Sequence, residues 1–170
     1  MIAIITLLVM PICLALAAVS DLFTMTIPNK ISAALLVGFL VLAPLVGLGW
    51  VPIGMSLVAA LGVFAVCFSL FAANVMGGGD AKLLTAAACW YGFTQSLTEF
   101  LVMTAMIGGV LTLFILVVRA HSNSVLAMGI ALPQSLTTAN KIPYGIAIAI
   151  AGFLTYDQAP LVALAMRGAG

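Results

Sequence analysis

Hydrophobic residues occur along this chain in long blocks that short polar connections separate. About six of these blocks approach the ~20 mostly apolar residues that a membrane-spanning helix needs. They lie at approximately 2–20, 31–49, 52–75, 81–97, 100–118 and 142–165. The pattern predicts an all-α membrane protein with about six transmembrane helices in a single domain over residues 1–170.

The composition supports a membrane location. The hydrophobic fraction is 65%, the charged fraction is 5% and the mean hydropathy is +1.37. About a quarter of the residues in an ordinary globular domain are charged. The net charge of +1 gives no basic surface for a nucleic acid. The three cysteines lie in apolar segments without a CxxC spacing, which favours small buried hydrophobes over metal ligands.

The basic residues predict an orientation in the bilayer. Four of the five fall in alternate connections, namely Lys30, Lys82, Arg119 and Lys141. Short loops rich in Lys and Arg stay on the cytoplasmic side. Cytoplasmic connections are therefore expected at 21–30, 76–82 and 119–141, with both termini outside. The connection 119–141 also contains an apolar stretch too short to span a bilayer, which is typical of an interfacial or re-entrant helix.

Two acidic residues lie at the predicted cytoplasmic ends of different spans. Asp21 ends the first span and Asp80 begins the fourth. A charged residue at membrane depth costs a few kcal/mol, so each is a candidate functional residue that needs a partner. Two carboxylates that share one proton can activate water against a carbonyl group, as in aspartic proteases. This chemistry requires neither a metal nor a cofactor.

The residues around the two acids allow structural and functional interpretations. Gly77, Gly78 and Gly79 allow backbone conformations closed to other residues and permit another backbone to approach closely, or they form a plain flexible turn between two spans. Pro28 is expected in the first turn of the second helix, with Asn29 as its cap. Lys82 either supports the site or anchors the helix at the cytoplasmic face.

In these positions the sequence resembles the type IV prepilin peptidases, which are membrane aspartic proteases of the GxGD class. The first motif is an aspartate followed shortly by Ile-Pro-Asn, the second is GxGDxK, and a weaker third is Pro-Tyr-Gly before the last span. The matching residues are Asp21 with Ile27, Pro28 and Asn29, then Gly77, Gly79, Asp80 and Lys82, then Pro143, Tyr144 and Gly145.

The resemblance implies a presenilin-like helical fold with Asp21 and Asp80 as the catalytic pair and the other motif residues as support. It also implies that the protein removes leader peptides from prepilins at the cytoplasmic face of a bacterial inner membrane. Longer family members carry paired CxxC motifs and methylate the new N-terminus. This sequence resembles the short form associated with tight-adherence (Flp) pili, and methylation is not expected of it.

Two other functions are compatible with a pair of membrane acids. Asp21 and Asp80 could bind a cation or proton in a small transporter, although the sequence shows no clear inverted repeat. They could also pair with lysines in a non-catalytic subunit of a pilus or secretion system. Cleavage of a prepilin that depends on both acids distinguishes a protease from these alternatives.

Overall fold

The computed structural model describes residues 1–120 and 142–168, and their regular secondary structure is helical. The elements are α1 (Ile2–Thr24), α2 (Asn29–Leu45), α3 (Trp50–Ala72), α4 (Gly78–Tyr91), α5 (Gln95–Ala120), α8 (Tyr144–Leu154), the 3₁₀ turn η1 (Tyr156–Gln158) and α9 (Pro160–Arg167). Helices α1, α3 and α5 are long and apolar enough to cross a bilayer, and α2 and α8 are shorter apolar helices. The prediction of an all-α membrane protein is confirmed.

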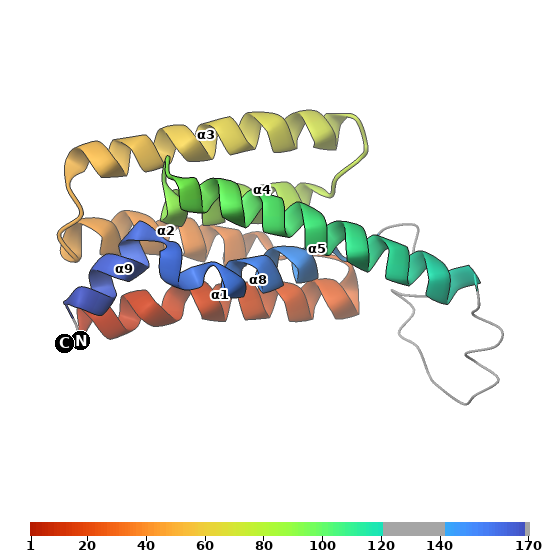
Figure 1. The fold of residues 1–170 in the computed structure, drawn as a ribbon, viewed down its shortest axis with the longest axis horizontal. Coiled ribbons are helices and arrows are strands. Elements are labelled where there is room, and N and C mark those ends of the chain that lie inside the picture. The colour runs from red at the N-terminus through yellow and green to blue at the C-terminus, as the bar shows by residue number, and fades with distance from the viewer. Residues whose placement is uncertain (121–141, 169–170) are drawn as a thin grey trace.

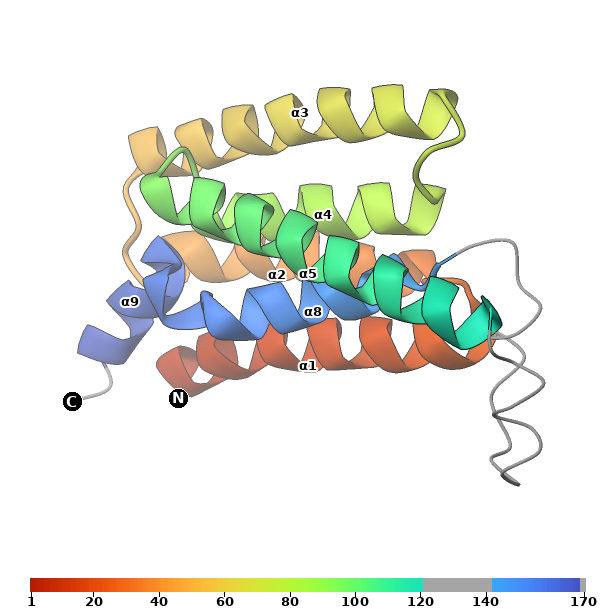
Figure 2. The ribbon, with the colours of Figure 1, turned by 45° about the vertical axis from the view of Figure 1, so that its right-hand side comes forward.

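Helix α4 lies at the centre of the bundle (Figures 1 and 2). It packs mainly against α3 and α2 and also contacts α8, α9 and α5. Its side chains from Ala86 to Tyr91 are buried without exception. A central helix contacts protein rather than lipid tails. This explains why the fourth predicted span is less apolar than its neighbours.

The connections from α1 to α2 and from α3 to α4 lie at the same end of the bundle (Figure 1). Met1 and the last turn of α9 lie at the other end. Successive helices run up and down, so alternate connections return to one end. This arrangement brings the two acidic segments together, as the order of spans predicts. Residues 121–141, where an interfacial or re-entrant helix was expected, lie outside the described ranges.

The segment expected to form one helix over 142–165 is broken. Helix α8 ends at Leu154, and α9 begins at Pro160 after the turn η1. Pro160 occupies the first position of α9, where its missing N–H costs no helical hydrogen bond, and proline disfavours the continuation of a preceding helix. The Tyr156 hydroxyl donates a hydrogen bond to the Leu7 carbonyl and fixes the break against α1.

The ends of α1 and α4 also differ from the predicted spans in a way that matters for the site. Helix α1 continues to Thr24, so Asp21 lies in its last turn. Helix α4 begins at Gly78, so Asp80 lies in its first turn. Helix α4 ends at Tyr91 and is capped by Gly92, whose φ of +63° favours glycine.

Candidate active site

Asp21 is buried in the last turn of α1, with 5% of its surface exposed. Met25 caps the end of the helix in a left-handed conformation (φ 54°) and donates its N–H to the Asp21 carbonyl at 3.0 Å. The Ser20 hydroxyl donates to the Thr26 carbonyl at 2.8 Å. These bonds hold the turn after Asp21 so that Ile27 points into the bundle, where it is buried.

The Asp21 carboxylate contacts the start of α8. The backbone N–H of Gly145 donates a hydrogen bond to Asp21 Oδ2 at 2.7 Å. This donor belongs to the first turn of a helix, whose N–H groups have no partner within the helix. The position has no room for a side chain, because a Cβ on Gly145 would lie 2.9 Å from Asp21 Oδ2. The third motif, Pro143-Tyr144-Gly145, therefore contacts the first acid directly.

Asp80 is also buried, with 9% of its surface exposed, in the first turn of α4. Its carboxylate folds back over the residue that caps the helix. A Cβ on Gly77 would lie only 2.7 Å from Asp80 Oδ2. The positive end of the helix dipole favours a carboxylate in this position.

Ile27 joins the two acidic segments. A Cβ on Gly79 would lie 3.1 Å from Ile27 Cβ and 3.4 Å from its backbone nitrogen. A Cβ on Gly145 would lie 2.9 Å from Ile27 Cδ1. The starts of α4 and α8 therefore both pack on the residue that follows Asp21 in the first motif. The missing side chain of Gly79 allows the backbone of Ile27 to approach closely. Gly79 lies within α4 and is not part of a flexible turn.

Lys82 and Asn29 form a hydrogen bond at the surface of the same region. Lys82 Nζ donates a hydrogen bond to Asn29 Oδ1 at 2.9 Å, and both side chains are exposed. Asn29 was expected to cap α2, but the structure places Pro28 at the cap and Asn29 at the first helical position. The expected side-chain cap is not made. The Asn29 amide instead connects the second helix to the fourth.

The remaining acids differ from this pair. Glu99 is half-buried near the start of α5 and accepts a hydrogen bond from Gln95, and Asp157 is exposed in η1. Asp21 and Asp80 are thus the two buried acids among the four in the chain. Within residues 1–120 and 142–168, no three His, Cys, Asp or Glu side chains gather as a metal site would require.

Tyr144 has a partner that sequence reasoning missed. Its ring occupies the space beside Gly108 of α5, where a Cβ would overlap the phenol. Small residues in membrane helices often mark close contacts, so the adjacent glycines Gly108 and Gly109 were the available signal. The positions of these glycines in the sequence do not indicate which side chain packs beside them.

The fold and the site define a helical membrane protein that buries one acidic residue at each of two adjoining helix ends. Comparison with known proteins is more specific. The chain belongs to the type IV leader peptidase family, whose model matches residues 8–117. That range contains Asp21 and Asp80 together with the Ile-Pro-Asn and GxGDxK residues. The resemblance to prepilin peptidases is confirmed at the level of the family.

Individual relatives agree with the family match. The chain is 31% identical over 141 residues to the prepilin leader peptidase/N-methyltransferase of Aeromonas salmonicida (strain A449). It is 30% identical over 141 residues to the protein of the same description from Aeromonas hydrophila. Each alignment covers 79% of this chain and 42% of the relative, so the chain spans less than half the length of these relatives. No solved structure matches the chain.

Proposed function

We propose that this protein is an aspartic endopeptidase that removes the leader peptide from type IV prepilins. The main supporting observation is that the starts of α4 and α8 both pack on Ile27, which follows Asp21 closely in the chain, so that the two buried acids lie at one end of the bundle. Family membership supports a peptidase, and both relatives are described as prepilin leader peptidases. Of the two activities in their names, we assign the peptidase, because paired carboxylates supply its chemistry.

In the proposed mechanism, Asp21 and Asp80 hold a water molecule between them. One carboxylate takes a proton from this water, while the other, protonated, donates a hydrogen bond to the scissile carbonyl oxygen. The water oxygen attacks the carbonyl carbon to form a tetrahedral intermediate. The C–N bond then breaks as the amide nitrogen receives a proton, and the two carboxyl groups again share one proton.

The supporting residues have distinct proposed roles. The Gly145 N–H orients the Asp21 carboxylate, and Gly77 leaves space for Asp80 to fold over the helix start. The contact between Gly79 and Ile27 sets how closely the two segments approach. The Lys82–Asn29 hydrogen bond holds the outer edge of this arrangement. These are positioning roles, since none of these groups needs to react with the substrate.

We further propose a bacterial inner membrane location with the site at the cytoplasmic face and the termini outside. The distribution of Lys30, Lys82 and Arg119 supports this orientation. The substrate in this proposal is a Flp-type prepilin, whose short basic leader precedes an apolar helix. The bilayer is the second partner, because cleavage next to such a helix must take place at the membrane.

Co-expression with a candidate prepilin tests this function. We expect the wild type to yield mature pilin, and Asp21→Asn and Asp80→Asn to yield only the precursor. Asp157→Asn is the matched control, because it changes an exposed acid. Immunoblotting verifies that all four proteins accumulate equally in the membrane. Leader cleavage that persists in both Asn variants would contradict the proposal and favour ion binding or a structural role in pilus assembly.

A further inference from the structure

An apolar groove of about 610 Å³ lies between α3 and α5. Its walls come mainly from these two helices, and its floor includes Leu84 of α4. The residues on α3 are Ala59, Gly62, Val63, Val66, Cys67 and Leu70, and those on α5 are Leu97, Leu101, Thr104 and Ala105. Spacings of three and four residues place each set on one face of its helix.

The groove offers almost no polar group. The Thr104 hydroxyl donates to the Phe100 carbonyl of its own helix at 2.8 Å, so that group is already satisfied. The walls also contain small residues, namely Ala59, Gly62 and Ala105. A Cβ on Gly62 would meet no heavy atom within 4 Å, which shows that the groove is open at this position. Small residues allow the backbones of two membrane helices to approach closely.

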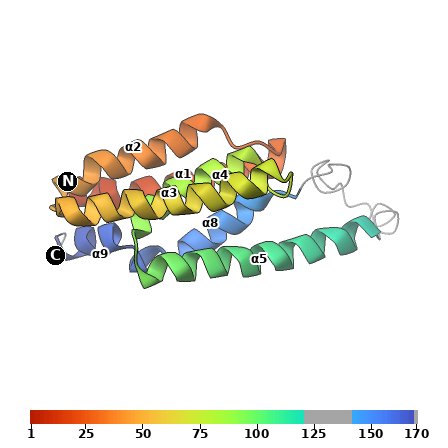
Figure 3. The ribbon, with the colours of Figure 1, turned by 90° about the horizontal axis from the view of Figure 1, so that it is seen from above.

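The two walls are held by different neighbours. Helix α3 packs mainly on α4, whereas α5 packs mainly on α8. Seen from above, α3 and α5 are separate helices that extend along the bundle (Figure 3). The two walls of the groove therefore rest mainly on different helices of the bundle.

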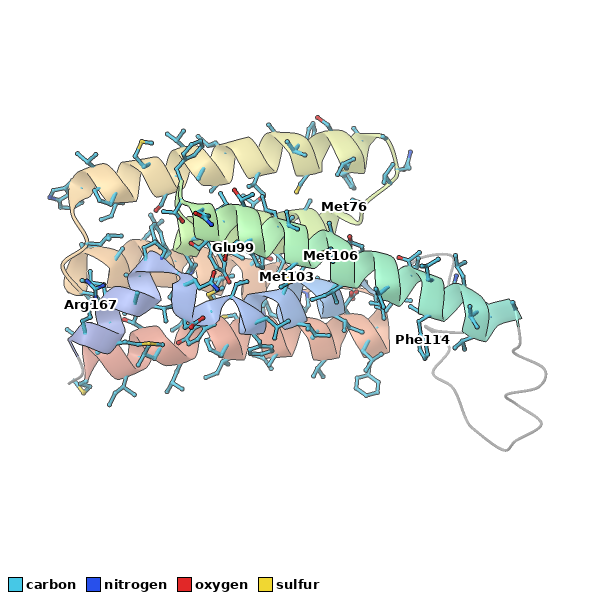
Figure 4. The ribbon with its side chains drawn as sticks, viewed as in Figure 1. Met76, Glu99, Met103, Met106, Phe114 and Arg167 are labelled. Atoms are coloured by element: carbon cyan, nitrogen blue, oxygen red, sulfur yellow. The ribbon has the colours of Figure 1, made fainter. Side chains whose placement is uncertain are left out.

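One end of the groove reaches the candidate active site. Met76 and Tyr144 line the groove, and they directly precede Gly77 and Gly145, the two glycines that contact the acids. Figure 4 shows Met76 beside the start of α4, away from Arg167 at the end of α9. The groove-lining residues of α3 continue from Leu70 to Ala59, a rise of ~17 Å or about three helical turns.

We infer that this groove binds the apolar helix of the prepilin, directly beside the bond that is cut. The inference rests on the proposed function, in which the apolar helix follows the leader. A peptide within a bilayer must satisfy its own backbone hydrogen bonds, so this part of the substrate enters as a helix. In lipid, packing, interhelical hydrogen bonds and lipid entropy drive the association of helices, and helix interfaces are enriched in small residues such as those of this groove. A lipid chain does not need small residues to pack against.

Two substitutions on α3 test the groove. Gly62→Leu fills it, whereas Gly54→Leu adds the same side chain at an exposed position outside the groove that also has no heavy atom within 4 Å of its Cβ. We expect Gly62→Leu to lower kcat/KM for a full-length prepilin about tenfold or more, and Gly54→Leu to leave it unchanged. Equal values for the two variants would overturn the inference. A wild type that cleaves no prepilin would instead contradict the proposed function.

Photo-crosslinking provides a test that does not depend on turnover. A benzoylphenylalanine is introduced at Val66 in the groove or at Leu61 on another face of α3, in Asp80→Asn protein, with prepilin in vesicles of bacterial lipid. The two native side chains are similarly exposed, at 62% and 66%. We expect a crosslink to the apolar helix of the prepilin from position 66 and none from position 61. Crosslinks to lipid alone from position 66 would show that lipid occupies the groove and would overturn the inference.

Discussion

The backbone N–H of Gly145 donates a hydrogen bond to Asp21 Oδ2 at 2.7 Å, across 124 positions of the sequence. This bond joins the first turn of α8 to the last turn of α1. It gives the weakest of the three sequence motifs a physical role, since a helix start with unpaired N–H groups faces a buried carboxylate. The chain thus orients its first acid with a residue from its last membrane segment.

Gly145→Ala should impair cleavage severely. The added Cβ would lie 2.9 Å from both Asp21 Oδ2 and Ile27 Cδ1, so the carboxylate must move. A displacement of about 1 Å at a catalytic group can cost about a hundredfold in rate. Prepilin processing measures the loss. Gly109→Ala is the control, because a Cβ there meets nothing within 4 Å. Equal activity of the two variants would exclude a steric role for Gly145.

Gly77→Ala should displace the Asp80 carboxylate, because its Cβ would lie 2.7 Å from Asp80 Oδ2. We expect a loss of cleavage of about tenfold or more, measured with purified enzyme and prepilin. The control is Gly49→Ala at the start of α3, where the nearest atom to a Cβ lies at 3.5 Å. Both glycines cap a helix with an ordinary negative φ, so neither substitution strains the backbone. Normal activity of Gly77→Ala would show that Asp80 adjusts freely.

Lys82 and Asn29 should act as a coupled pair. Their hydrogen bond is exposed, so we expect Lys82→Met and Asn29→Ala each to slow cleavage by no more than about fivefold, equivalent to about 1 kcal/mol. The double variant should be no slower than the slower single variant. Kinetic constants for the four proteins complete the double-mutant cycle. Fully additive effects would instead favour Lys82 as an independent membrane anchor.

Tyr91→Phe should reduce stability but not cleavage. The buried Tyr91 hydroxyl lies 2.8 Å from Thr155 Oγ1 and 3.3 Å from the Gly152 carbonyl. Its loss should lower the free energy of unfolding by about 1 kcal/mol, seen as a lower Tm in detergent. Tyr91 lies 11 residues beyond Asp80, or ~17 Å along the same helix, so catalysis should be unaffected. A processing rate that falls while Tm is unchanged would contradict this separation.

Hydropathy predicted the general positions of the helices but not their relative burial. Lipid tails are as apolar as a protein core, so the faces of a spanning helix that contact lipid and protein carry similar residues. The central position of α4 therefore had only one indirect signal, its lower hydropathy. The break before Pro160 was also missed, because an averaged hydropathy does not respond to a single proline within an apolar stretch.

The candidate site was predictable in part. The order of spans placed Asp21 and Asp80 at one end of the bundle, and the motifs around them identified Ile27, Gly79 and Gly145 as candidates. Their contacts were not predictable. Asn29 shows the difference, since its type and position suggest a helix cap, whereas its observed partner is Lys82 on another helix.

The sequence by itself determined that this protein is helical, lies in a membrane and carries two acids at alternate connections. These are local properties, because apolar length and residue order depend on neighbouring residues and on the direction of the chain. The tertiary structure decided that Ile27 lies between Gly79 and Gly145, that Gly145 holds Asp21, and that a groove from α3 and α5 ends beside them. Such contacts join residues that are distant in sequence, and their packing is settled only when all the helices are in place.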